Sequence, residues 1–225
     1  MKRITVLLVE DHRLVREGFR ALLEHEKDIE VVGEANDGRQ ALRLTAKLRP
    51  EVVVMDIAMP TLNGLEATRQ IQKGFPQIAV LILSAHSDDA YVEQVAALGA
   101  AGFLLKQTSS HELGTAIRAV HEGKTFFGAS ILKRVQNRSQ KALNQNGDPG
   151  KKSNHLSSRE VEVLQLIAEG KANKQVASEL GVSFKTVDKH RQHLMSKLNI
   201  HDVAGLTRYA IAEGIIESTV RITIS

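Results

Sequence analysis

The chain of 225 residues contains no cysteine. Without thiols it can form neither a disulfide nor a thiolate metal site, which suits a reducing compartment such as the cytoplasm. Long apolar runs are also absent, because no stretch approaches the ~18 apolar residues of a membrane span. The apolar run near the start, Ile4 to Val9, is shorter than the ~7–15 apolar residues of a signal peptide. We therefore expect a cytoplasmic protein that does not contact the membrane.

Length and composition indicate globular material divided into more than one domain. Hydrophobic residues make up 42% and charged residues 25% of the chain, as in ordinary globular proteins. Its length of 225 residues is near the size at which one hydrophobic core usually becomes two. The net charge of +4 gives only weak support for nucleic acid binding. Residues 155 to 217 carry eight basic and eight acidic side chains, so most of the basic excess lies before them, in a polar stretch that reads as a flexible linker.

The first 122 residues alternate between apolar runs and amphipathic stretches. The runs predict strands at residues 4–9, 30–35, 52–55, 78–83 and 101–104, and the stretches predict helices at about 13–24, 38–48, 64–73, 88–98 and 110–122. Strands that alternate with helices in this way indicate an α/β fold with a doubly wound, five-stranded parallel sheet of the flavodoxin-like kind. Ligands of such sheets bind beyond the carboxyl ends of the strands.

Chemistry-bearing side chains follow four of these strands. Glu10 and Asp11 follow the first strand, Asp56 the third, Ser84 the fourth and Lys106 the fifth. Because the first and third strands are neighbours in this kind of sheet, the carboxylates should meet in one cleft, where their oxygens suit Mg²⁺. The hydroxyl and the ammonium group would complete a pocket for a phosphoryl group. Asp56 is then the candidate nucleophile, which would form an acyl phosphate.

Each of these residues also has an ordinary structural explanation. Asp11 could cap the first helix, and Asp56 could be a turn residue. The polar segment that begins at Ser84 would cap the fourth helix in any case, and Lys106 could be a solvated lysine. The arrival of five such residues after four strands of one sheet favours a functional site.

The C-terminal quarter predicts a helix-turn-helix. A short helix from Lys174 to Leu180, capped by Asn173, leads into a turn at residues 181–183. Ser183 can cap the second helix, because its hydroxyl can accept from a free backbone N–H of the first turn. The apolar side of that helix comprises Val187, Leu194 and Leu198. Such a pair of helices, with donors on the outer face of the second, is typical of proteins that read double-stranded DNA.

Flanking signals extend this module to four helices. Ser157 and Glu160 form a capping box, and Gly170 supplies a left-handed stop. Asp202 can cap a last helix that turns Val203, Leu206 and Ala210 inward and ends at Gly214. We therefore expect an all-α domain at residues 155–217.

Candidate DNA contacts lie mainly on the second helix of the helix-turn-helix. Asp188, Lys189 and Gln192 face outward and are candidates for base edges, whereas Lys185, His190 and Lys197 are candidates for phosphate contacts. The complete predicted set is Lys174, Ser183, Lys185, Thr186, Asp188, Lys189, His190, Gln192 and Lys197. A solvated helix would carry a similar polar face, but the turn and the caps before it favour DNA binding.

Several segments resemble one known family. VLLVEDH, VVVMDIAMPTLNGLEA, ILSAHSDD and GAAGFLLK resemble the receiver domain of response regulators, and residues 156–198 resemble the LuxR-type DNA-binding domain. Together the chain resembles a two-component response regulator of the NarL/FixJ type. The resemblance implies a sensor histidine kinase that phosphorylates Asp56. It also implies a site residue set: Glu10, Asp11, Asp56 and the carbonyl of Ala58 for Mg²⁺, Ser84 and Lys106 for the phosphoryl oxygens, and Phe103 as the switch residue.

The resemblance also gives the domain organisation. It implies a receiver at residues 1–122, a linker at 123–154, a LuxR-type domain at 155–217, a tail at 218–225, and a homodimer when phosphorylated. Two positions depart from the family's pattern. Phe103 lacks the hydroxyl of a frequent tyrosine, which puts a switch through that hydroxyl in doubt. Asp188 stands where a basic residue is common, so we expect weaker phosphate attraction and a different base preference there.

Two other functions compete with this interpretation. A haloacid-dehalogenase-like phosphatase would also combine an Asp nucleophile, Mg²⁺, a hydroxyl and a lysine on an α/β sheet. Its chemistry needs a second acid two residues after the nucleophile to protonate the leaving group. Ala58 occupies that position, so we expect no enzyme. A regulator that works without phosphorylation is disfavoured by the complete set of five pocket residues.

Overall fold

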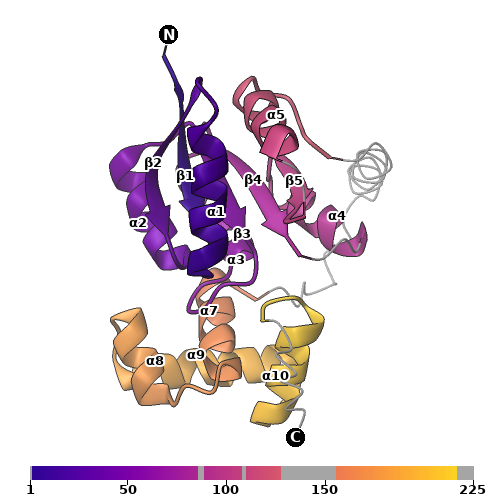
Figure 1. Cartoon of the computed structure of the whole chain (residues 1–225). Coiled ribbons are helices and arrows are strands. Elements are labelled where there is room, and N and C mark those ends of the chain that lie inside the picture. Colours follow the sequence, from indigo (N-terminus) through magenta and orange to yellow (C-terminus); the bar gives the residue numbers. More distant parts are fainter. Residues whose placement is uncertain (1, 86–88, 108–109, 128–155, 217–225) are drawn as a thin grey trace, which may run out of the picture. The chain divides into compact units, whose positions relative to one another are not determined.

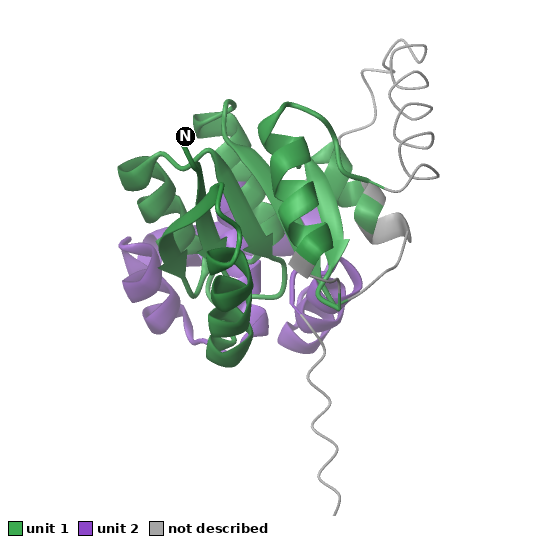
Figure 2. Ribbon diagram, turned by 45° about the horizontal axis from the view of Figure 1, so that its top comes forward, with its two compact units in different colours: residues 1–152 green, residues 153–225 purple. Residues whose placement is uncertain are grey.

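The computed structural model describes residues 2–85, 89–107, 110–127 and 156–216. The chain forms two compact units, residues 1–152 and 153–225 (Figure 2). Each unit has its own core and is described by itself. The predicted linker from residue 128 onward and the predicted tail at 218–225 lie outside the described residues, as does residue 88 of the predicted fourth helix.

The first unit is the predicted five-stranded sheet with helices on both faces (Figure 1). All strand pairs are parallel, in the order β2-β1-β3-β4-β5. The strands are β1 (Ile4–Val9), β2 (Ile29–Ala35), β3 (Val52–Asp56), β4 (Ala79–Ser84) and β5 (Gly102–Leu105). The helices are α1 (Arg13–Glu24), α2 (Gly38–Leu48), α3 (Gly64–Gly74), α4 (Asp89–Ala97) and α5 (Ser110–His121). The predicted fold class is confirmed, and every predicted element is present within one or two residues of its expected bounds.

Strand side chains alternate between two buried layers, which explains why the strands read as continuous apolar runs. Leu7 and Val9 of β1 join a core that α2, α3 and α4 complete. Val6 and Leu8 join the opposite core, which α1 and α5 complete. Because both faces of the sheet are covered, polar side chains gather at the strand ends.

The strand register aligns those ends. Val9 of β1 pairs with Met55 of β3, and Asp56 pairs with Leu83 of β4. Ser84 pairs with Leu105 of β5, and the next N–H, that of Lys106, donates to the Ser84 carbonyl at 2.8 Å. The last residues of β3 and β4, Asp56 and Ser84, therefore meet the residues that follow β1 and β5 at one edge of the sheet.

The linker was predicted to begin at residue 123, but the chain stays packed against the sheet up to residue 127. The N–H of Phe126 donates to the carbonyl of Ala101 at 2.8 Å, and its carbonyl accepts from Phe103 at 2.9 Å. Phe126 and Phe127 also pack against the two cores of the sheet. Residues up to 127 thus belong to the first unit, because two aromatic side chains gain burial there after the helical periodicity has ended.

The second unit contains the four predicted helices: α7 (Ser158–Ala168), α8 (Asn173–Leu180), α9 (Phe184–Leu198) and α10 (Val203–Ala212). Ser157 and Glu160 form the predicted capping box, and Ser183 and Asp202 accept the predicted cap hydrogen bonds. The shared core comprises mainly Leu164, Val176, Val187, Leu194 and Leu206. Within the described ranges of both units, none of the helices is long and apolar enough to cross a membrane.

Two details of this unit differ from the sequence-based prediction. Asn173 is the first residue of α8 rather than its cap, and its Oδ1 accepts from Arg191 Nη1 at 2.9 Å. The N–H of the capping residue, Ala172, instead donates to Gln175 Oε1. Val203, expected to face inward, is 44% exposed, and Ile215 beyond the helix is buried instead.

Candidate functional site

The carboxyl edge of the sheet brings together Glu10, Asp56 and Lys106. Lys106 Nζ lies 2.8 Å from Glu10 Oε2 and 2.9 Å from Asp56 Oδ2. Glu10 and Asp56 are only 1% and 2% exposed, so the two carboxylates share one ammonium group where water scarcely reaches. Asp56 Oδ1 accepts from the N–H of Ile57 at 2.8 Å, which fixes the orientation of the carboxylate.

This environment shifts the pKa values of both partners. Burial raises the pKa of Asp56 to about 6, and the nearby charge of Glu10 adds to this effect, while Lys106 opposes it. For Lys106, burial disfavours the ammonium form, but the charges of Asp56 and Glu10 outweigh burial and raise its pKa. At neutral pH the pocket therefore holds a charged ammonium group beside a largely ionised carboxylate.

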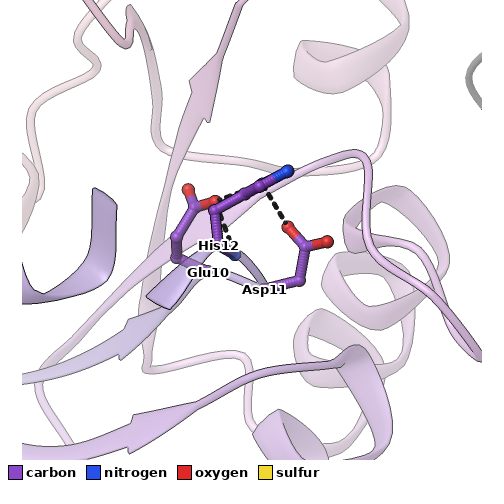
Figure 3. Close-up of side chains that lie close together, drawn as sticks. All are labelled: Glu10, Asp11 and His12. Atoms are coloured by element: carbon purple, nitrogen blue, oxygen red, sulfur yellow. Dashed lines mark hydrogen bonds and ion pairs between the residues drawn. The ribbon is translucent and has the colours of Figure 1, made fainter. Parts of the chain in front are cut away.

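Asp11 and His12 extend the acidic group at the end of β1 (Figure 3). His12 Nδ1 lies 3.2 Å from Glu10 Oε1 and 2.9 Å from Asp11 Oδ1, and the imidazole is 69% exposed. His12 is also the N-cap position of α1, where no side-chain cap hydrogen bond forms. The capping alternative for Asp11 thus gains no support. Sequence analysis did not name His12 as a site residue. Its position directly after Glu10 and Asp11 was the only feature of the sequence that could have indicated it.

The donor set at this edge fits a hard divalent cation. Glu10 Oε2, Asp11 Oδ1 and Asp56 Oδ2 are buried, and a nitrogen lies within 2.9 Å of each. None of the three receives a well-directed hydrogen bond from the described residues. Ligand atoms of Glu10, Asp11 and His12 lie within 4.8 Å of one another. Incompletely satisfied carboxylate oxygens are the ligands that Mg²⁺ takes in proteins, whereas an imidazole is not.

The remaining predicted pocket residues lie on the same edge or next to it. Ser84 is buried at the end of β4, and its carbonyl holds the backbone of Lys106. Ala58 is half-buried in the loop after β3. Phe103 is half-buried on β5 and packs against one core of the sheet. The sheet therefore joins at one edge the hydroxyl, the ammonium group and the carboxylates that the sequence placed after separate strands.

Gly64, at the start of α3, lets the chain pass close to Asp56. Its N–H donates to the carbonyl of Ile57 at 2.8 Å. A Cβ at this position would lie 1.9 Å from the carbonyl oxygen of Asp56, where no side chain can fit. The loop after β3 is thus held tightly against the helix that follows it.

Arg16 supports the acidic loop from α1. Its Nη1 donates to the backbone carbonyl of Glu10 at 2.6 Å, and its Nε donates to Glu34 Oε2 at 3.0 Å. Sequence analysis missed this residue, because its two acceptors lie on β2 and just after β1 and become neighbours only through the fold.

The second unit presents the outer face of α9. Lys185, Lys189 and Gln192 are exposed, and Asp188, Thr186 and His190 are half-buried. An open hollow of about 540 Å³ is lined by Ser183, Lys185, Thr186, Lys189, His190 and His193. In the part of the chain that the structure describes, Lys185 and Lys189 have no ion-pair or hydrogen-bond partner. Lys174 is exposed in the first turn of α8. These cationic side chains are therefore available to an anionic ligand.

Lys197 differs from the lysines at the start of α9. Its Nζ lies 2.6 Å from Oε2 of Glu160, whose side chain is 5% exposed, while Lys197 itself is 41% exposed. Arg191 is similarly engaged, with Asn173. The predicted phosphate contact of Lys197 therefore competes with an internal ion pair that joins α9 to α7.

Comparisons with known proteins agree with both units. Residues 6–118 match the family described as the response regulator receiver domain, and residues 154–210 match the family of bacterial regulatory proteins called luxR. The transcriptional regulatory protein LiaR of Bacillus subtilis is 39% identical over 207 residues, which cover 92% of this chain and 96% of LiaR. The oxygen regulatory protein NreC of Staphylococcus epidermidis is 37% identical over 218 residues, which cover 94% of this chain and 99% of NreC.

A solved structure extends the likeness to a complex with DNA. It contains RcsB from Salmonella enterica serovar Typhimurium bound to the promoter rprA in the presence of the phosphomimetic BeF3-. RcsB is 26% identical to this chain, with a TM-score of 0.56, and the match covers 92% of this chain and 98% of RcsB. The chain thus belongs to the NarL/FixJ family of DNA-binding response regulators.

Proposed function

We propose that Asp56 is the phosphoacceptor of this response regulator and that a sensor histidine kinase is its phosphodonor. The observation that carries the proposal is the nearly buried Asp56 carboxylate, fixed by the Ile57 N–H and 2.9 Å from the Lys106 ammonium group. An Asp56 oxygen attacks the phosphorus of phosphohistidine, so that a P–O bond forms as the P–N bond breaks. The electron pair stays with the histidine nitrogen, which takes up a proton.

The side chains around Asp56 support this reaction in distinct ways. Lys106 already forms ion pairs with two carboxylates, and its ammonium group is within reach of phosphoryl oxygens that arrive at Asp56. The hydroxyl of Ser84 is the second proposed contact to those oxygens. Glu10, Asp11, Asp56 and the carbonyl of Ala58 would hold Mg²⁺, which offsets the negative charge of the incoming phosphoryl group.

The proposed output is regulated DNA binding. Movement of Ser84 and Lys106 onto the phosphoryl oxygens, with a change of Phe103 rotamer, would reshape the surface of α4, β5 and α5 and favour a homodimer. Two copies would then bring two α9 helices to two half-sites of double-stranded DNA. The proposed contacts are Lys174, Ser183, Lys185, Thr186, Asp188, Lys189, His190 and Gln192. A regulator with this output acts where the DNA is, in the cytoplasm.

The direct test is phosphorylation of the full chain by acetyl phosphate with Mg²⁺, followed by intact mass measurement. We expect the mass of one phosphoryl group to be added to the wild type and none to Asp56→Asn. Asp188→Asn, which removes a carboxylate from the other unit, is the matched control and should be modified like the wild type. Full modification of Asp56→Asn would overturn the assignment.

A further inference from the structure

Asp188 is an acidic side chain on the outer face of α9, and it is paired with Gln192. Gln192 Nε2 donates to Asp188 Oδ2 at 3.0 Å. Residues four apart lie on the same side of a helix, so both side chains point in the same direction. Gln192 is exposed and Asp188 is half-buried. This hydrogen bond limits the conformations of both side chains on the surface that is proposed to face DNA.

The pair presents mainly hydrogen-bond acceptors. An ionised carboxylate only accepts hydrogen bonds, and the amide of Gln192 has two hydrogens, one of which is used by Asp188. The outward groups are therefore Asp188 Oδ1 and Gln192 Oε1, with one amide hydrogen left. A surface of this kind attracts donors and repels acceptors.

We propose that Asp188 and Gln192 act together to select a base that offers an exocyclic amino group in the major groove. This inference rests on the proposed DNA-reading role of α9. Only N4 of cytosine and N6 of adenine donate hydrogen bonds in that groove, whereas guanine presents O6 and N7 and thymine presents O4. A carboxylate that faced guanine or thymine would meet acceptors alone.

Neighbouring cations make an acidic reading residue compatible with DNA. Lys185 and Lys189 are exposed on the same helix, and in the described ranges neither has a hydrogen-bond or ion-pair partner. Their charges offset the repulsion between Asp188 and the DNA phosphates. Lys189 can also donate to O6 and N7 of a guanine, which is the pairing partner of cytosine. This complementarity makes cytosine the better of the two bases.

The first experiment is a selection from a randomised DNA duplex library with the full chain treated with acetyl phosphate. We expect one base pair in each half-site to be selected in one orientation only, with its cytosine or adenine on the strand that faces Asp188. Asp188→Asn should relax that position and admit the base pair in the opposite orientation, with guanine or thymine facing residue 188, because an amide can donate as well as accept. Glu213→Gln, which removes one negative charge beyond α10 rather than on α9, is the matched control and should leave the selected motif unchanged.

The second experiment identifies the amino group. N4-methylcytosine or N6-methyladenine at the restricted position removes the hydrogen that faces the major groove and keeps the base pair. We expect one of these duplexes to bind the wild type about tenfold more weakly, which corresponds to about 1.4 kcal/mol. Asp188→Ala should bind the methylated and unmethylated duplexes equally.

The outcomes separate this inference from the function on which it rests. A motif that stays the same in Asp188→Asn, or binding that is unaffected by methylation of the cytosine or adenine at every selected base pair, would overturn the proposed role of the Asp188–Gln192 pair but leave DNA reading by α9 intact. Binding without any selected motif would instead contradict the proposed DNA-reading role itself.

Discussion

Replacement of Lys197 by alanine should destabilise the DNA-binding unit. Lys197 Nζ is bound to the buried Oε2 of Glu160, which also accepts from the N–H and the hydroxyl of Ser157. Burial tends to raise the pKa of Glu160, but the hydrogen bonds from Lys197 and Ser157 outweigh it and lower the pKa. Lys197→Ala would leave that carboxylate with the Ser157 donors alone, at the start of α7.

The size of the effect follows from the exposure of the two partners. A hydrogen bond to a buried charged group contributes about 1.5–3 kcal/mol, and an exposed ion pair contributes about 0–1 kcal/mol. With Glu160 5% exposed and Lys197 41% exposed, the pair falls between these limits. We expect a loss of about 1 kcal/mol, which lowers the melting temperature of a domain of this size by about 4–8 °C.

Calorimetry of the full chain can measure this loss, with the receiver transition as an internal reference. Lys197→Arg should keep most of the stability, because a guanidinium group can replace the ammonium group. Lys185→Ala, on the same helix, is the matched control, because Lys185 is an exposed, proposed phosphate contact with no partner among the described residues. It should change stability by less than about 0.5 kcal/mol but weaken binding to all DNA sequences and reduce the salt dependence. An unchanged melting temperature in Lys197→Ala, with weakened DNA binding, would refute the structural role and restore the phosphate contact.

Three further predictions concern the receiver. Gly64→Ala should lower the free energy of unfolding of the receiver by about 3 kcal/mol or more, because the new Cβ would overlap the Asp56 carbonyl oxygen. A normal melting temperature and phosphorylation rate in this variant would contradict the prediction. Asp11→Ala should slow phosphorylation by acetyl phosphate severalfold at limiting Mg²⁺, and an undiminished rate would count against the proposed cleft. Hydrogen bonds from Lys2 and from the Thr5 N–H lower the pKa of Glu51 to about 2, from an ordinary 4.5. Glu51 therefore stabilises the fold above pH 4.5, and this contribution is lost as pH falls toward about 2. In urea unfolding at neutral pH, Glu51→Gln should lower the free energy of unfolding by about 1–2 kcal/mol, a range that allows for solvent screening of the exposed Lys2. The variant should also lose less stability than the wild type as the pH falls from 4.5 toward 2.

The sequence predicted the receiver site well, because its members are fixed by where strands end. The interior of a strand buried on both faces excludes charged side chains, so Glu10 and Lys106 mark the ends of β1 and β5 in the sequence itself. Parallel pairing then aligns those ends, as in the pairing of Asp56 with Leu83. Side-chain partners follow no such rule. The contact of Arg16 with the Glu10 carbonyl depends on how α1 is oriented against β1, and no local pattern encodes that orientation.

The basic residues of α9 illustrate the same limit in the second unit. Their periodicity gives the face on which each residue lies, but a face that is exposed on an isolated helix is not necessarily free in the domain. Lys189 has no partner among the described residues, whereas Lys197 meets a carboxylate that the capping box of α7 has already oriented. Glu160 thus serves two elements at once, since the same oxygen closes the start of α7 and anchors α9. A count of charges along α9 assigns both lysines to DNA; only the packing of α7 against α9 separates the lysine that can bind a ligand from the lysine that holds the domain together.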